Sequence, residues 1–256
     1  MLSDELDVFL LDLDGVVYVG DRPVPYAAEA IARLRAAGRA VRFVTNDPRP
    51  TREDLATRLR SMGIEAAVDE IASSGRAAAL YLREQGLSRV YPVGSDGLAR
   101  ELVSAGLDLA DARADAVVVG CDERLGYEHL RVATEHLYAG AAFVAANVDG
   151  AFPTERGMAP ATGAIVAALS VASGREPVVV GKPEPALFDA ATRGLPRGVR
   201  IGMVGDRIES DVVGAQRYGI PGILVSPDPD ARGADAVIAD LRGLFDPRVS
   251  LIELAR

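Results

Sequence analysis

Two patterns of apolar and polar residues alternate along this chain: short apolar runs, and longer stretches with helical periodicity. Short apolar runs such as 8–11 predict buried strands, and stretches such as 27–37, AAEAIARLRAA, carry apolar residues on one helical face. The other predicted strands are 40–44, 89–93, 114–120, 141–147, 199–205 and 219–225. The other predicted helices are 51–62, 96–105, 126–138, 161–172, 184–192 and 208–218. Strands that alternate with helices predict an α/β fold, in which helices cover both faces of a parallel sheet.

The composition limits the partners of this chain. Its 256 residues are 49% hydrophobic, enough for a sizeable core in one large domain or two smaller ones. The formal net charge of −9 disfavours nucleic acid and anionic membranes as partners. The single cysteine, Cys121, cannot form an internal disulfide, and the N-terminal stretch lacks the basic region of a signal peptide. We therefore expect a soluble cytoplasmic protein.

Acidic residues follow two of the predicted strands. Asp12 and Asp14 come directly after the first strand, and Asp206 and Asp211 come after a strand near the C-terminus. Two carboxylates at a strand end can share one cation, and their pKa values can be pushed apart. Each segment alone is also an ordinary acidic turn or helix start, so neither decides the chemistry.

Two further polar segments come after other apolar runs. Thr45 and Asn46 could donate hydrogen bonds to an anion, although Thr-Asn-Asp-Pro is also a common turn. Lys182, in VVVGKPEP, is the only lysine, since every other Lys or Arg position holds arginine. A compact ammonium acts as a point charge where a planar guanidinium does not fit, so this lysine suggests an anion site. A solvated surface lysine remains the alternative.

Parallel sheets place ligand sites at the carboxyl ends of their strands, so we expect these four segments to gather at one edge. Several carboxylates around one lysine need a counter-cation. Hard oxygen ligands with room for water suit Mg²⁺. Mg²⁺, a lysine and hydroxyl or amide donors are together what a phosphoryl group requires.

With these motifs the chain resembles the haloacid dehalogenase-like (HAD) superfamily of aspartyl-phosphate hydrolases. Within it, the chain resembles the NagD-like or 4-nitrophenylphosphatase-like branch. The matching residues are DLDGVVYVG (12–20), VTN (44–46), GKP (181–183) and GDRIESD (205–211). The resemblance implies a Mg²⁺-dependent phosphatase that acts on a small phosphorylated metabolite.

The resemblance also implies a role for each matched residue. Asp12 would be the nucleophile that forms the aspartyl phosphate, and Asp14 would be the general acid and base. Asp206 would bind Mg²⁺ together with Asp12 and the backbone carbonyl of Asp14, and Asp211 would orient metal-bound waters or Lys182. The residues that would hold the phosphoryl group are Thr45, Asn46, Lys182 and Arg207.

The presence of Asp14 bears on the reaction type. Dehalogenation in this superfamily needs neither a general acid at that position nor Mg²⁺, so we favour phosphate ester hydrolysis. Phosphomutases also carry the second aspartate and stay open. One departure from the family is Asp47, where many relatives have a second asparagine. We expect His129, His136 and Cys121 to be surface or packing residues.

The distance between motifs along the chain predicts a second domain. Far more residues separate Asn46 from Lys182 than the roughly 30 of one strand–helix–strand unit. We expect a doubly wound, Rossmann-like core of residues 1–83 and 178–256, with a smaller α/β cap of residues 84–177 inserted between them. The segment NVDGAFPTERG, 147–157, is the candidate specificity loop, with a plain surface loop as the alternative.

Two other classes of protein compete with the phosphatase hypothesis. One is a receiver-like phosphoacceptor signalling protein, which is a single small domain whose phosphoacceptor follows a middle strand. The other is a catalytically idle HAD-fold binding protein. The sequence does not name the substrate, because sugar phosphates, glycerol phosphate, phosphoglycolate and nucleoside monophosphates all occur in this branch. Relatives often pair through their caps, so a homodimer is the assembly that the resemblance implies.

Overall fold

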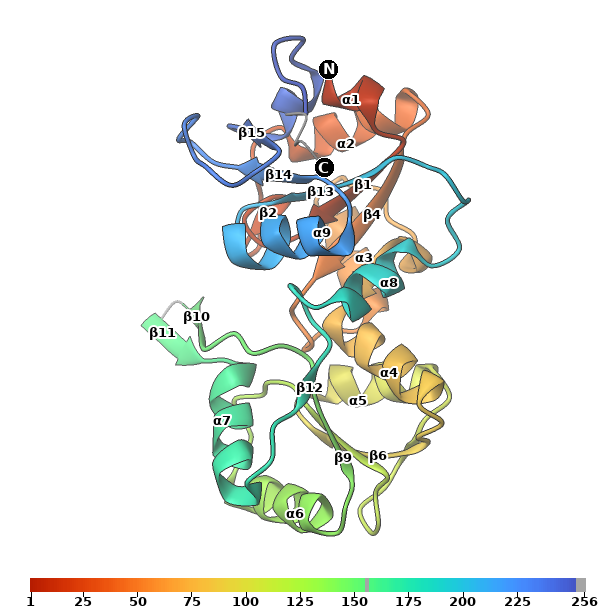
Figure 1. Ribbon diagram of the computed structural model, residues 1–256, viewed down its shortest axis with the longest axis vertical. Helices are drawn as coiled ribbons and strands as arrows, with labels where there is room; N and C mark the ends of the chain where they lie inside the picture. The colour runs from red at the N-terminus through yellow and green to blue at the C-terminus, as the bar shows by residue number, and fades with distance from the viewer. Residues whose placement is uncertain (155–156, 252–256) are drawn as a thin grey trace. The chain divides into compact units, whose positions relative to one another are not determined.

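The computed structural model describes residues 1–154 and 157–251 of the chain (Figure 1). Contacts divide the chain into two compact units. The first unit comprises Met1–Thr45, Leu55–Ala72 and Ala191–Arg256, and the second comprises Asn46–Asp54 and Ser73–Ala190. Each unit is built on its own sheet, which confirms the α/β class that the sequence predicts.

A six-stranded sheet with the order β15-β14-β13-β1-β4-β5 forms the centre of the first unit. Its strands are β1 (Val8–Asp12), β4 (Ala40–Thr45), β5 (Ile71–Ser73), β13 (Ile201–Gly205), β14 (Gly222–Val225) and β15 (Ala236–Ile238). β1 runs parallel to β4 on one side and to β13 on the other. Every residue of β1 is buried, which explains why this strand is an apolar run rather than an alternating pattern.

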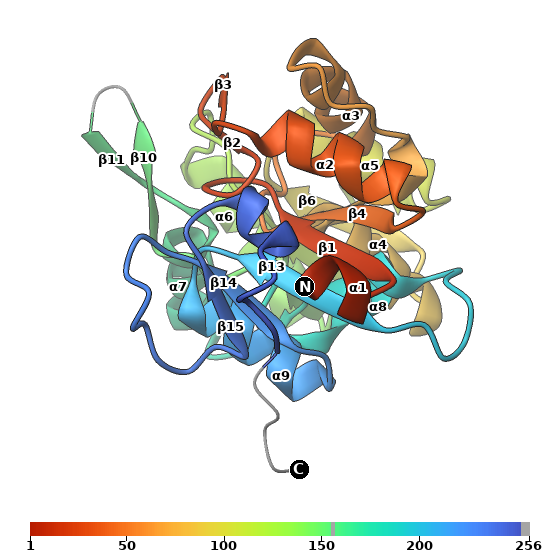
Figure 2. The ribbon, with the colours of Figure 1, turned by 90° about the horizontal axis from the view of Figure 1, so that it is seen from above.

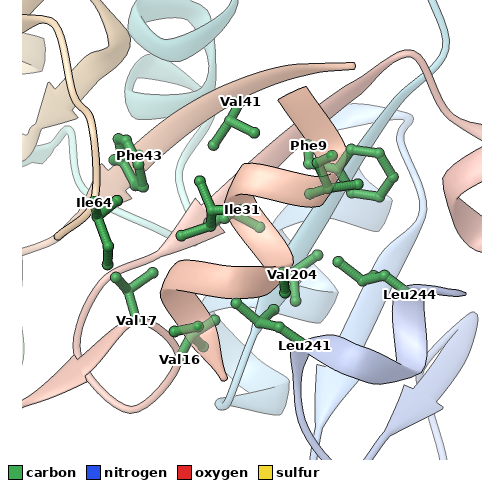
Figure 3. Packing of buried hydrophobic residues seen from close by; sticks show 14 of the residues in the cluster. Phe9, Val16, Val17, Ile31, Val41, Phe43, Ile64, Val204, Leu241 and Leu244 are labelled. Carbon is green, nitrogen blue, oxygen red and sulfur yellow. The ribbon is translucent and has the colours of Figure 1, made fainter. Parts of the chain in front are cut away.

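Helices cover both faces of this sheet, with α2 (Ala27–Ala36) on one face and α9 (Val213–Tyr218) on the other (Figure 2). α2 buries the apolar stripe that the sequence predicts, Ala27, Ala30, Ile31 and Leu34. Figure 3 shows Ile31 packed among Phe9, Val41, Phe43 and Val204, which come from the sheet. The remaining helices and strands here are α1 (Leu2–Glu5), β2 (Tyr18–Val19), β3 (Arg22–Pro23), the 3₁₀ turns Val68–Glu70 and Leu241–Phe245, and most of α3 (Arg52–Ser61).

A five-stranded parallel sheet with the order β12-β9-β8-β6-β7 forms the second unit. Its strands are β6 (Arg89–Val93), β7 (Asp108–Leu109), β8 (Ala116–Val119), β9 (Ala142–Ala145) and β12 (Val178–Val179). Its helices are α4 (Ser74–Glu84), α5 (Asp96–Ser104), α6 (Tyr127–Tyr138), α7 (Thr162–Ser173) and most of α8 (Pro185–Thr192). Throughout the described ranges, no helix is long and apolar enough to cross a membrane.

The candidate specificity loop, 147–157, overlaps a β-hairpin. β10 (Ala151–Thr154) pairs antiparallel with β11 (Gly157–Pro160), next to α7. Residues 155–156 of the predicted loop lie outside the described residues. The two glycines and the proline of this segment hid the strand from the sequence pattern, because they break the alternation by which an exposed strand is recognised.

The two units do not follow the predicted domain limits of 83/84 and 177/178. β12 lies at the start of the predicted second core segment, but it forms the edge of the second sheet. There Val178 and Val179 pair with Val144 and Ala145 of β9. A short apolar run predicts a strand but does not name its partner, and this is the physical reason for the difference. The functional cap limits of 84–177 stay a prediction.

Residues 46–54 belong to the second unit because α5 and the residue before it hold them. Arg52 Nε and Glu101 Oε1 form an ion pair of 2.7 Å, in which the Glu101 side chain is only 1% exposed. Ser95 Oγ donates a hydrogen bond of 2.7 Å to the carbonyl of Arg49. A Cβ atom added at Gly97 would lie 2.0 Å from that same carbonyl oxygen, so only glycine allows this close approach.

Candidate active site

The carboxyl ends of three neighbouring strands meet at one edge of the first unit's sheet. β1 ends at Asp12, which lies opposite Val44 of β4, and Asp206 follows directly after β13. Both strand pairs are parallel, so their carboxyl ends share this edge. Thr45, the last residue of β4, is only 3% exposed. The strand ends therefore bring Asp12, Thr45 and Asp206 to the same edge.

Three carboxylates converge at this edge. One carboxylate oxygen from each of Asp12, Asp206 and Asp211 lies within 4.8 Å of the other two. Asp12 and Asp211 are buried, whereas Asp206 is exposed. Carboxylates this close repel one another, and burying them is costly unless a cation or a proton offsets their charge. Hard oxygen donors with access to solvent fit Mg²⁺, which usually keeps several of its waters.

Asp211 reaches the group from a π-helical turn, Ile208–Val212, which precedes α9. Asp211 Oδ2 accepts a hydrogen bond of 3.0 Å from the backbone N–H of Arg207. A Cβ atom added at Gly205 would lie 2.2 Å from the Cβ atom of Asp211, so only glycine fits there. Arg207 itself is exposed, and its contact with a phosphoryl group stays a prediction.

Gly15 makes room for Asp206 in the turn that follows Asp12. Its φ is +88°, and an added Cβ atom would lie 2.3 Å from Oδ2 of Asp206. The Gly15 N–H donates a hydrogen bond of 2.8 Å to the carbonyl of Tyr18, which closes the turn. Asp14, next to Gly15, is exposed and lies outside the three-carboxylate group. An exposed carboxylate is accessible to a substrate, as a general acid must be.

Lys182 and Asn46 are joined to each other within the second unit. The backbone N–H of Lys182 donates to Oδ1 of Asn46 at 2.8 Å, and Nδ2 of Asn46 donates to the carbonyl of Lys182 at 3.0 Å. Lys182 is 5% exposed. The apolar run before Lys182 forms β12, which pairs with β9 of the second sheet, and the place of Lys182 beside Asp12 stays a prediction.

Three residues fix the backbone around Asn46: Ser74, which no motif indicated, Asn147 of the candidate specificity loop, and Gly181 of the GKP motif. The carbonyl of Asn46 accepts hydrogen bonds of 2.6 Å from both Ser74 Oγ and Asn147 Nδ2. A Cβ atom added at Gly181 would lie 2.8 Å from Oδ1 of Asn46 and 2.4 Å from the carbonyl oxygen of Ala146. Gly181 therefore permits the close approach of Lys182 to Asn46. The only sequence signals were the polar NVD triplet at Asn147 and the glycine before Lys182.

Asp47, which departs from the family pattern, forms an ion pair with Arg49. Asp47 Oδ1 and Oδ2 accept hydrogen bonds of 2.8 Å from Nε and Nη2 of Arg49. The Arg49 guanidinium lies 4.4 Å from the centre of the Phe152 ring, in the hairpin strand β10. The carboxylate thus orients a cation that an asparagine would hold less strongly, because charge-assisted hydrogen bonds are stronger than neutral ones.

Comparison with known proteins decides the family. The family model of the haloacid dehalogenase-like hydrolases matches residues 9–108, and a HAD-hydrolase-like model matches residues 179–242. The D-glycerol 3-phosphate phosphatase of Mycobacterium tuberculosis is 38% identical over 230 residues, which are 88% of this chain and 64% of that enzyme. The acid sugar phosphatase of Staphylococcus saprophyticus is 38% identical over 208 residues, 80% of each chain. The chain belongs to the HAD-like hydrolases.

Solved structures place this HAD-like hydrolase in the phosphatase branch that the sequence resembles. The 4-nitrophenylphosphatase of Thermotoga maritima matches with a TM-score of 0.87 and 30% identity, over 95% of this chain and 98% of that one. A glycerol phosphate phosphatase from Mycobacterium tuberculosis, solved in complex with magnesium, matches with a TM-score of 0.86 and 36% identity. That match covers 95% of this chain and 77% of the other. A putative NagD protein has the same fold.

The remaining titratable candidates of this HAD-like hydrolase have packing contacts instead of a place among the carboxylates. His136 is buried, its ring centre lies 5.1 Å from that of Tyr91, and its Nδ1 accepts a hydrogen bond from the N–H of Ala114. His129 Nδ1 accepts a hydrogen bond of 3.1 Å from the N–H before α6. Cys121 is buried, and its burial raises the pKa of the thiol.

Proposed function

We propose that this HAD-like hydrolase is a Mg²⁺-dependent phosphatase that hydrolyses small phosphate monoesters through an aspartyl phosphate on Asp12. The observation that carries the proposal is the close group of Asp12, Asp206 and Asp211 at the end of β1. The named relatives act on glycerol 3-phosphate or are acid sugar phosphatases. We therefore propose a sugar or polyol phosphate, such as glycerol phosphate, as the substrate class.

The carboxylates of the first unit supply the metal ligands in this proposal. Asp12 and Asp206 would hold Mg²⁺ with the backbone carbonyl of Asp14, and Asp211 would fix the turn that carries them or a metal-bound water. Bound Mg²⁺ offsets the repulsion between the Asp12 carboxylate and the phosphoryl oxygens, so that the two anions can approach. The chemistry of the donors supports this assignment, since all are hard oxygens.

Asp12 and Asp14 would divide the chemistry between them. An Asp12 oxygen attacks phosphorus, the bond from phosphorus to the ester oxygen breaks, and Asp14 gives its proton to the departing oxygen. The alcohol leaves, and an aspartyl phosphate remains. Asp14, now a carboxylate, takes a proton from water as the water oxygen attacks phosphorus. Inorganic phosphate leaves, and the Asp12 carboxylate and protonated Asp14 are restored.

The remaining residues would hold the charge of the phosphoryl group. Thr45 would donate its hydroxyl, Arg207 its guanidinium and Lys182 its ammonium. The single lysine at position 182 supports this assignment, because one compact cation can lie between a carboxylate and a phosphate where a planar guanidinium cannot. The side chain of Asn46 forms two hydrogen bonds with the backbone of Lys182, one with its N–H and one with its carbonyl.

The proposal is tested by measuring inorganic phosphate released from a panel of esters. The panel holds glycerol phosphate, sugar phosphates, phosphoglycolate, a nucleoside monophosphate and 4-nitrophenyl phosphate, each with Mg²⁺ or with EDTA. We expect many turnovers per protein molecule with Mg²⁺, loss of turnover in EDTA, and a preference for a sugar or polyol phosphate. A single, stoichiometric phosphorylation without turnover would favour a signalling protein instead, and no phosphate release from any ester would overturn the proposal.

A further inference from the structure

The carboxamide of Asn46 faces a backbone segment rather than open space. Its oxygen accepts the N–H of Lys182, and its nitrogen donates to the carbonyl of the same residue. The pairing uses one acceptor and one donor, as a neighbouring strand would. The other amide hydrogen lies toward Asp149, whose Oδ2 is 3.5 Å from Nδ2. Both polar atoms of this side chain are therefore directed at groups of the second unit.

We propose that Asn46 is a positioning residue for Lys182 and that its carboxamide is not a ligand of the phosphoryl group. The inference rests on the proposed function, in which the Lys182 ammonium offsets the charge of nucleophile and phosphate. It revises the role that the family resemblance implies for Asn46. The two-point pairing fixes the backbone of Lys182 through a side chain that lies far away along the sequence.

Chemistry explains why this lysine needs such a support. Lys182 carries its charge on a flexible four-carbon stem, which can take many conformations unless its base is fixed. Glycine and proline flank it, and neither side chain can form a hydrogen bond that holds the segment in place. The Asn46 carboxamide supplies the missing bonds. A displacement of about 1 Å at a catalytic group can lower the rate by about 100-fold, so a small shift of Lys182 is enough to matter.

Asn46 is itself fixed from its other side, which makes it a firm support. Ser74 Oγ and Asn147 Nδ2 both donate to its backbone carbonyl. Asn147 Oδ1 in turn accepts a hydrogen bond from the N–H of Asp149. The Asp149 carboxylate is the group toward which Nδ2 of Asn46 points. The absence of a Cβ atom at Gly181 lets Lys182 approach to hydrogen-bond distance. Each of these contacts lies within the second unit.

A kinetic test compares Asn46→Ala, Lys182→Ala and the double variant with 4-nitrophenyl phosphate and Mg²⁺. If Asn46 acts through Lys182, each single variant lowers kcat by about 100-fold, and the double variant is no worse than Lys182→Ala within about threefold. If Asn46 held the phosphoryl group independently, the two losses would multiply and KM would rise with Asn46→Ala alone. That multiplicative result would overturn the inference.

A second test does not depend on activity. Because Lys182 is the only lysine, ¹⁵N-lysine labelling of the whole chain gives one backbone amide signal. We expect the hydrogen exchange of this amide to be about tenfold faster in Asn46→Ala, which removes its acceptor, and unchanged in Ser173→Ala, which removes a hydroxyl hydrogen bond elsewhere in the second unit. Equal exchange in wild type and Asn46→Ala would overturn the inference.

The two tests separate failure of the inference from failure of the proposed function. A wild-type protein that releases no phosphate would contradict the proposed function, and the amide exchange would still show whether Asn46 holds Lys182. If Asn46→Ala does not fold, Asn46→Leu, which also lacks the acceptor, replaces it in the exchange test, and Asn46→Asp replaces it in the kinetic test. This variant keeps the shape and the acceptor but loses the donor, so the inference predicts a lowered kcat that again does not add to the loss in Lys182→Ala.

Discussion

An added Cβ atom at Gly15 would lie 2.3 Å from Oδ2 of Asp206, so the turn after Asp12 leaves no room for a side chain beside the Asp206 carboxylate. Gly15→Ala therefore has two effects. Its φ of +88° strains any L-residue by about 1–2 kcal/mol, and the new methyl group displaces Asp206. We expect a lower free energy of unfolding and a much higher Mg²⁺ concentration for half-maximal activity.

Gly219→Ala is the matched control for that experiment. Gly219 has φ of +89°, but nothing lies within 4 Å of an added Cβ atom. We expect the same loss of stability without a change in the Mg²⁺ requirement. Thermal melting and a Mg²⁺ titration of phosphate release measure the two effects separately. An equal change of Mg²⁺ requirement in both variants would show that backbone strain, rather than contact with Asp206, is responsible.

The ion pair between Arg52 and Glu101 is expected to stabilise the second unit strongly. Glu101→Ala leaves the guanidinium of Arg52 with little exposure and without this carboxylate. Breaking a buried pair from one side costs about 3–5 kcal/mol, which denaturant unfolding measures. The neighbouring pair of Arg100 and Asp54 is exposed on both sides, so Arg100→Ala should cost less than about 1 kcal/mol. Similar losses in the two variants would contradict this account.

The hydrophobic pattern predicted the elements with a buried face well. β6 lies at the predicted residues 89–93, and α2 and α6 begin or end within about one residue of the predicted limits. The pattern failed in two places. It missed β12, which has two residues, because its partner β9 is not encoded in the segment itself. It missed the hairpin of β10 and β11 because glycine and proline break the alternation by which an exposed strand is recognised.

The sequence indicated which residues supply the chemistry of the site better than it indicated the contacts that hold those residues in place. Acids after β1 and β13 could be expected to meet, because parallel strands share a carboxyl edge. The pairing of Asn46 with Lys182 could not be predicted, since it joins side chain to backbone across a large stretch of chain. The same holds for the hydrogen bond from Asn147 to the Asn46 carbonyl, since the sequence marked Asn147 only as part of the candidate specificity loop. The need for glycine at Gly205 depends on the position of Asp211 and is visible only in three dimensions.

Stability in acid should depend on Asp115, which joins β8 to the start of β6. Its carboxylate accepts hydrogen bonds from the guanidinium and the backbone N–H of Arg89, and these lower the pKa of Asp115 to about 2. A depressed folded-state pKa stabilises the fold above the ordinary value of 3.8, and this stabilisation is lost as the pH falls toward about 2. The gap in melting temperature between wild type and Asp115→Asn should therefore narrow between about pH 4 and pH 2. A gap independent of pH would contradict this.

Cys121 should react slowly with thiol reagents in the folded protein. Its burial removes access and raises the pKa of the thiol, so little thiolate forms near neutral pH. Labelling with a chromogenic disulfide reagent should be complete only after denaturant is added. Cys121→Ala should keep the wild-type rate of phosphate release. Fast labelling of the folded protein, or a large loss of activity in the variant, would contradict the assignment of Cys121 to packing.

The role of Asp12 as nucleophile tests the account most directly. The measurement is the rate of 4-nitrophenol release from 4-nitrophenyl phosphate with Mg²⁺, for wild type, Asp12→Asn and Asp246→Asn. Asp246 lies in the same unit and pairs at the surface with Arg248, so its variant controls for the loss of one carboxylate. We predict turnover in wild type and Asp246→Asn, and none above background in Asp12→Asn. Turnover in Asp12→Asn close to the wild-type rate would contradict an aspartyl phosphate on this residue.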